Sequence, residues 1–144
     1  MRLMESIREQ LKSNAVALIS LTIALIALGH DTWRSEVSEE NRNIRIASFE
    51  VLKNLGELQV VVNASHFSDS KMNINPMNGW GYIALIGDLS QLIPEPVPEK
   101  AQQLVKTWGS QWSNIHSDET AADAITEKID DSRLSVLEVL RSLH

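Results

Sequence analysis

An uncharged apolar run from Ala15 to Gly29 constrains this chain more than any other feature of its sequence. Ser20 and Thr22 are the only residues in the run with polar side chains. As an α-helix the run rises about 22 Å, which is short of the roughly 30 Å hydrocarbon core of a bilayer. An extension from Leu11 to Trp33 reaches about 33 Å, and the amphipathic Trp33 ring suits the membrane interface. The run therefore predicts a transmembrane helix over residues 15–30 that borrows length from its flanks.

A cleaved signal peptide is the alternative, because the run has signal-peptide length and ends in the small residues around Leu28. The leader, residues 1–14, argues against cleavage, since Glu5 and Glu9 lie among its basic residues. Apolar residues recur in it at the spacing of an amphipathic helix that continues into the run: Leu3, Ile7 and Leu11. We therefore expect a retained anchor. The basic residues of the leader lie closer together than those after the run, which favours a cytoplasmic N-terminus.

The remaining chain, residues 31–144, predicts helices only. Its first segment extends to about His66, with a very polar stalk over residues 31–46 and a packed part beyond it. The apolar positions of this segment follow a helical spacing of three and four: Trp33, Val37, Ile44, Ala47, Val51, Leu55, Leu58 and Val62. Turn-forming residues over 67–79 predict a loop. We expect residues 47–144 to fold, together with the stalk helix, as an extracytoplasmic bundle.

Three further helices complete this prediction. The segment from Trp80 to Ile93 is short and nearly apolar all round, which favours burial over an exposed partner-binding patch. Alternating prolines after it predict an extended connector, with Pro98 opening the next helix. That helix carries one apolar face: Ala101, Leu104, Val105, Trp108, Trp112 and Ile115. Ser117 or Asp118 caps the last helix, whose stripe is Ala122, Ile125, Ile129, Ser132, Val136, Val139 and Leu143.

Short connections make consecutive helices antiparallel neighbours. The sequence therefore predicts an all-α protein in which an N-terminal transmembrane helix continues into a stalk and an up-down four-helix bundle. The last helix should return toward the stalk.

Composition excludes several classes of function. The chain has no cysteine, so it has neither a disulfide framework nor a thiolate metal site. Its formal net charge is −6, and no basic patch marks a nucleic-acid partner. No nucleotide loop, metalloprotease motif or catalytic triad order is present. We expect no enzyme, no catalytic residue and no cofactor.

The chain resembles a group of small single-span inner-membrane proteins of Gram-negative bacteria that have no assigned activity. The resemblance covers most of the chain after the apolar run. It is carried by Thr32-Trp33-Arg34, Glu40-Asn41-Arg42-Asn43-Ile44-Arg45, Ala47, Phe49-Glu50, Leu55-Gly56-Glu57-Leu58, Gly79-Trp80, Asp88-Leu89, Pro94 and Pro96-Val97-Pro98. It implies a single-pass protein of the bacterial inner membrane with its bulk in the periplasm, and it implies no activity or site.

Two sets of residues are candidates for docking a partner. Small residues form one stripe within the apolar run, where another helix can approach closely in lipid: Ala17, Ser20, Ala24 and Ala27. The alternative is the ordinary abundance of alanine in spanning helices. Charged and amide residues cluster above the run, for pairing with a partner stalk or for plain solvation: Glu40, Asn41, Arg42, Asn43 and Arg45.

Two further sets of residues have both a functional and a structural interpretation. Aromatic residues line either a small-ligand pocket or the core: Trp80, Tyr82, Trp108 and Trp112. His66 and His116 should approach each other at one end of the bundle, near Asp69, Asp118 or Glu119. Two imidazoles and a carboxylate suit a transition metal, but helix-terminal histidines are more often solvated, so we expect no metal site.

The sequence thus predicts a membrane-anchored extracytoplasmic adaptor that binds another envelope protein or a copy of itself through helix packing. The alternative function is a sensor-like bundle that binds a small ligand and signals through a partner.

Overall fold

A computed structural model describes the backbone of residues 2–67 and 75–143, and within these ranges the side chains except those of residues 2–13, 30–33, 35 and 67. Helix α1 spans Arg2–Phe67, α2 spans Gly79–Ser90, α3 spans Val97–Gln111 and α4 spans Glu119–Ser142. Two short 3₁₀ helices, η1 (Pro76–Asn78) and η2 (Trp112–Asn114), precede α2 and follow α3. No strand occurs in the described ranges. The all-α fold class is confirmed.

The chain divides into two compact units, residues 1–40 and 41–144. The first contains the apolar run. In the described part of the chain, no helix combines the length and the apolarity needed to cross a bilayer. The side chains on which the leader and Trp33 predictions depend lie outside the described residues, as does most of the 67–79 loop.

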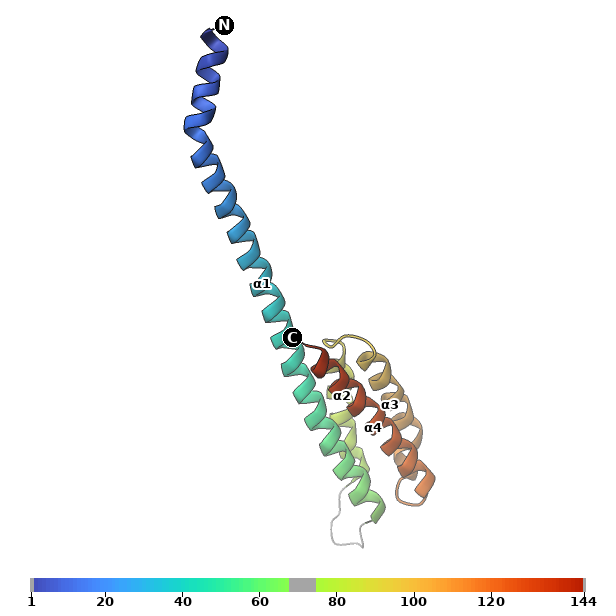
Figure 1. The fold of residues 1–144 in the computed structure, drawn as a ribbon. Helices are drawn as coiled ribbons and strands as arrows, with labels where there is room; N and C mark the ends of the chain where they lie inside the picture. Colours follow the sequence, from blue (N-terminus) through green and yellow to red (C-terminus); the bar gives the residue numbers. More distant parts are fainter. Residues whose placement is uncertain (1, 68–74, 144) are drawn as a thin grey trace. The chain divides into compact units, whose positions relative to one another are not determined.

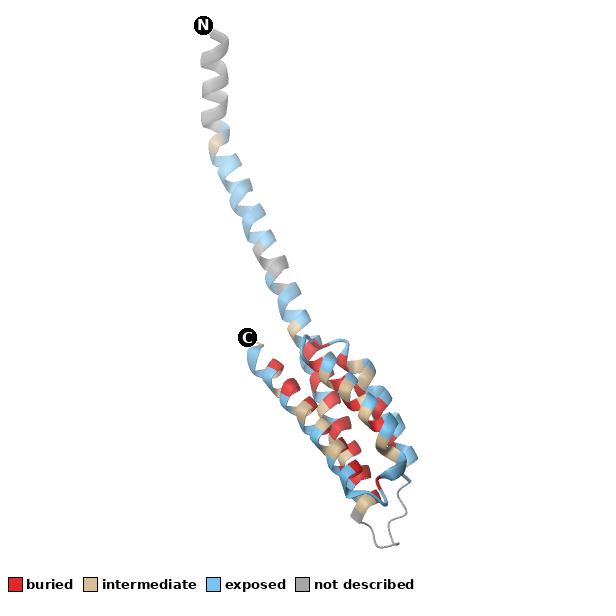
Figure 2. Ribbon diagram, turned by 90° about the vertical axis from the view of Figure 1, so that its right-hand side faces the viewer, coloured by how far each residue is buried: buried red, intermediate tan, exposed pale blue. Residues whose placement is uncertain are grey.

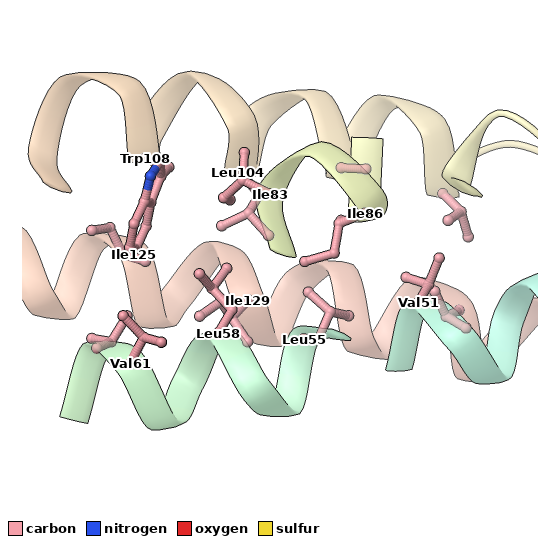
Figure 3. Close-up of a cluster of buried hydrophobic side chains, with 14 of the residues drawn as sticks. Val51, Leu55, Leu58, Val61, Ile83, Ile86, Leu104, Trp108, Ile125 and Ile129 are labelled. Atoms are coloured by element: carbon pink, nitrogen blue, oxygen red, sulfur yellow. The ribbon is translucent and has the colours of Figure 1, made fainter. Parts of the chain in front are cut away.

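Four helical segments pack around one core in the second unit (Figure 1). Figure 2 shows the buried residues on the faces that these segments turn toward one another. Figure 3 shows apolar side chains from all four helices meeting in the core. The largest fully buried side chains are Trp108, Leu55, Leu58, Ile83, Ile86, Leu104, Ile115, Ile125 and Ile129. Each helix therefore buries one apolar face, and the removal of apolar surface from water is the main favourable term in folding.

Contacts between α1 and α4 show that these two helices run antiparallel. Near the start of the packed part of α1, Arg45 Nη2 donates a hydrogen bond to the Leu143 carbonyl, at 3.2 Å. Further along α1, Gln59 Nε2 donates to Thr126 Oγ1, at 3.1 Å. The C-terminal end of α4 thus lies beside the start of the packed part of α1, as the short connections predicted.

The apolar stripes predicted for α1, α3 and α4 are buried in large part, but Val37 is exposed, and Val105 and Trp112 are only partly buried. Among the α1 side chains that the structure describes, Ile44 is the first buried one. Every residue of the predicted α4 stripe from Ala122 to Val139 is buried. Asp118 caps α4 by accepting a hydrogen bond from the Thr120 backbone N–H, at 2.9 Å.

Helix α2 differs in part from the prediction of burial. Ile83 and Ile86 are buried, whereas Leu85 on the other side of the helix is exposed, as is Leu92 in the turn that follows α2. A twelve-residue helix that packs against neighbours on one side keeps its other side open, and its apolar composition does not reveal which side that is.

Candidate functional site

The apolar run is the first candidate site. Its large side chains are exposed in every direction around the helix. Leu21 points about 140° away from Val16, and Ile26 about 140° further round, because successive residues of an α-helix turn by about 100°. Their exposed fractions are 71%, 57% and 67%. Thr22 Oγ1 donates to the Leu18 carbonyl at 2.8 Å, so this hydroxyl is satisfied within the helix itself.

The small-residue stripe lies on the same part of α1. Ala17, Ser20, Ala24 and Ala27 are all exposed. They fall within a sector of about 80° on the helix surface. The structure therefore leaves this stripe open to another helix.

The polar cluster above the run has a more varied environment. Glu40 belongs to the first unit, and the other members belong to the second. Arg42 and Asn43 are exposed and Asn41 is partly buried. Arg45 holds the C-terminal end of α4 through the Leu143 carbonyl. One member predicted to dock a partner is thus engaged within the bundle.

Three of the four candidate aromatic residues meet. The rings of Trp80 and Trp108 pack edge to face with centroids 6.4 Å apart, and those of Trp80 and Trp112 lie 6.3 Å apart. Trp108 is 0% exposed, whereas Trp80 is 40% exposed. Tyr82 packs against the core. The cluster thus reaches from the interior to the surface.

The Trp108 indole carries an unexpected feature. Its Nε1 atom is buried and has no hydrogen-bond partner among the described residues. A buried N–H group without an acceptor costs free energy of folding. The unpartnered Trp108 N–H is therefore either a structural cost of the fold or the donor to a bound acceptor.

Each of the two histidine rings contacts the backbone carbonyl of the residue that precedes the other histidine. His66 Nδ1 lies 2.9 Å from the Ile115 carbonyl oxygen, and His116 Nδ1 lies 3.2 Å from the Ser65 carbonyl oxygen. A carbonyl oxygen only accepts, so both rings carry a proton on Nδ1. The pair joins the end of α1 to the chain that follows α3.

The described residues contain no group of three His, Cys, Asp or Glu side chains placed to hold a metal ion. Asp69, one of the carboxylates considered for such a site, lies outside the described residues. Asp118 instead caps α4, and its hydrogen bonds from the Thr120 side chain and backbone hold the pKa of its carboxyl below the ordinary value of 3.8.

Sequence reasoning missed one exposed surface. Ile46, Phe49 and Val60 lie on the side of α1 opposite the core and are each more than half exposed. Lys53 and Gly56 lie between them on the same side. These five positions recur at intervals of three and four in the sequence, but Lys53 and Gly56 interrupt the run of apolar residues, so the pattern does not stand out.

The described residues define a class: an all-α protein with a four-helix core within residues 41–144 and an apolar helical segment within residues 1–40. Comparison with protein families, with curated proteins and with solved structures finds no match for the chain.

Proposed function

We propose that this chain is a membrane-anchored adaptor: the first unit inserts in the bacterial inner membrane, and the helical bundle binds an envelope partner on the periplasmic side. One observation carries the proposal. Between Val16 and Leu28 the helix exposes large apolar side chains in all directions. Packing against one neighbour covers only one side of a helix, whereas lipid covers every side.

Two further observations support insertion. The run contains no charge, and its Thr22 hydroxyl already has an acceptor within the helix. Helix α1 continues in both directions beyond Ala15 and Gly29, so helical backbone extends into the flanks that a full crossing needs. Insertion of such a segment leaves no backbone polar group without a partner.

The docking surfaces follow from the same proposal. In lipid, the small-residue stripe at Ala17, Ser20, Ala24 and Ala27 lets a second helix approach closely. Outside the bilayer, Glu40 and Arg42 are exposed and present charge to a partner stalk. The adaptor then acts by position, holding a partner beside its own anchor, with no chemical step.

A charge introduced into the run tests the anchor. Leu21→Arg places a guanidinium within the apolar segment, at a cost of about 2.5–3.5 kcal/mol near the bilayer centre. The matched control is Leu134→Arg, since Leu134 is 60% exposed on α4 and Leu21 is 57% exposed. We expect alkaline carbonate to extract the Leu21→Arg chain from membranes and to leave the wild type and the control in the pellet. Release of the wild type would contradict the anchor.

Cross-linking tests the adaptor role. A photoreactive residue at position 24 or position 42, introduced into the full chain in native membranes, should capture one defined envelope protein. The same residue at position 134 should not capture it. Recovery of lipid alone from both positions would reject docking at these surfaces.

A second function has one observation in its favour, which is the unpartnered Trp108 Nε1. A small molecule that accepts a hydrogen bond from this atom would make the bundle a ligand-binding sensor. Native mass spectrometry of the full chain purified from its membrane should then show a bound compound that Trp108→Phe loses. A wild-type mass equal to that of the chain alone would remove this alternative.

A further inference from the structure

The outer face of α1, formed by Ile46, Phe49, Lys53, Gly56 and Val60, has the spacing of a coiled-coil seam. Its residues recur at intervals of three and four, which places them on one stripe. The core-facing stripe of the same helix, which includes Leu55 and Leu58, lies on the opposite side. Helix α1 therefore has two apolar stripes, of which the bundle covers only one.

Single exposed apolar residues are normal on protein surfaces, so the comparison with other helices matters. The outward side of α4 carries Leu134 alone among charged residues, namely Glu127, Asp130, Glu138 and Arg141. On α1, three large apolar side chains and an open glycine share one side. A Cβ atom added at Gly56 would meet nothing within 4 Å, so a partner helix has room to approach there.

We infer that the outer face of α1 binds a second copy of this chain as a short parallel coiled coil. The occupant is indicated by the charges beside the seam. When two identical helices pair in parallel, a residue just before the first seam position of one faces the residue five places later on the other. That rule places Arg45 opposite Glu50 of the partner copy, and the two-fold axis repeats the attraction. Both residues are exposed. Arg45 uses Nη2 for the Leu143 carbonyl of its own chain, but a guanidinium has five N–H donors, so the others remain for Glu50 of the partner copy.

Lys53 opposes its own copy in this arrangement, which weakens the pairing but fixes its register. Its ammonium already lies 3.8 Å from a Glu50 carboxylate oxygen of the same helix, and its long stem lets the charge reach water. A seam of about two heptads is small for a stable dimer in solution. The strength of the pairing rests on the proposed membrane anchor, because two copies held in one membrane share an orientation and a high effective concentration.

Single cysteines test the pairing directly, since the chain has no native cysteine. In a parallel dimer Phe49→Cys meets its own copy, and a disulfide needs Cβ atoms about 4 Å apart. Leu134→Cys is the matched control, with exposed fractions of 62% for Phe49 and 60% for Leu134. We expect oxidation of full-length protein in membranes to give a disulfide-linked dimer at least about fivefold more abundant for Phe49→Cys, as two surface ion pairs imply. Equal yields, or no dimer in a chain that remains in the membrane pellet, would overturn the inference while leaving the anchor intact.

Charge reversal tests the parallel register. Added to Phe49→Cys, Arg45→Glu should lower the dimer yield roughly fivefold. Adding Glu50→Arg to that chain should restore the yield, because the intermolecular pair is rebuilt with its signs exchanged. Failure of the second change to restore the dimer would overturn the parallel arrangement. A photoreactive residue at position 49 that captures a different protein instead of a second copy would overturn the choice of occupant.

Discussion

Gly79 lies so close to the indole of Trp108 that a Cβ atom built on the glycine would stand 2.2 Å from Cζ2 of the ring. Trp108 is fully buried. The first residue of α2 is therefore glycine because a side chain there would occupy the volume of the largest residue in the core.

The first prediction follows from this contact. Gly79→Ala forces the Trp108 ring to move, and overpacking of this kind lowers the free energy of unfolding by about 1–3 kcal/mol. Gly81→Ala is the control, because a Cβ atom there meets nothing within 4 Å and alanine favours helix. Urea denaturation of the full chain, followed by circular dichroism, measures both. A Gly79→Ala chain as stable as the wild type would contradict the contact.

Truncation of a buried leucine should separate core from surface. Leu58 is fully buried between helices, so Leu58→Ala leaves a cavity and lowers the free energy of unfolding by about 2–5 kcal/mol. Leu134→Ala removes an exposed side chain of the same size and should change stability by less than about 0.5 kcal/mol. Thermal denaturation of the two variants gives the comparison. Similar losses for both would contradict the burial of Leu58 in the core.

The histidine contacts predict which substitution is tolerated. Nδ1 of His116 donates to the Ser65 carbonyl, and the amide nitrogen of asparagine can occupy nearly the same place. We expect His116→Ala to lower the free energy of unfolding by about 0.5–1.5 kcal/mol and His116→Asn to lose less. Nitrogen-15 NMR of the imidazoles provides an independent check, since both rings should carry the Nδ1 proton at neutral pH. A ring protonated only on Nε2 would rule out the hydrogen bond.

Acid should weaken the cap of α4. Hydrogen bonds from Thr120 hold the pKa of Asp118 below 3.8, so the folded state favours the ionised carboxylate. The resulting stabilisation is present above the unfolded pKa and is lost as the pH falls through the lower folded value. Asp118→Asn keeps a capping oxygen that does not titrate. The stability of this variant should therefore fall less steeply than that of the wild type between about pH 5 and pH 2, as followed by circular dichroism. Parallel curves for the two chains would contradict the pKa shift.

Regular helical spacing made much of this fold predictable. The α4 stripe alternates intervals of three and four without interruption, and each residue from Ala122 to Val139 on it is buried. In contrast, the segment that forms α2 is apolar nearly all round, so its sequence does not show which side faces the core. The exposure of Leu85 and Leu92 therefore could not be predicted.

The candidate sites were less predictable because they depend on contacts between distant residues. Nothing in the sequence pairs Arg45 with the Leu143 carbonyl or leaves Trp108 Nε1 without an acceptor among the described residues. The meeting of His66 with the chain after α3 was foreseen, since antiparallel helices bring those ends together. The sequence did not predict that these histidines would bond to backbone carbonyls instead of to a metal ion.

The antiparallel pairing of α1 with α4 also governs the order in which this protein is able to fold during its synthesis. The ribosome makes the buried face of α1 first, yet the residues that cover it, such as Thr126 opposite Gln59, emerge about seventy positions later. Until then Leu55 and Leu58 remain exposed to solvent. By that stage the apolar run has already left the exit tunnel of the ribosome. A chaperone has that interval in which to bind the uncovered face.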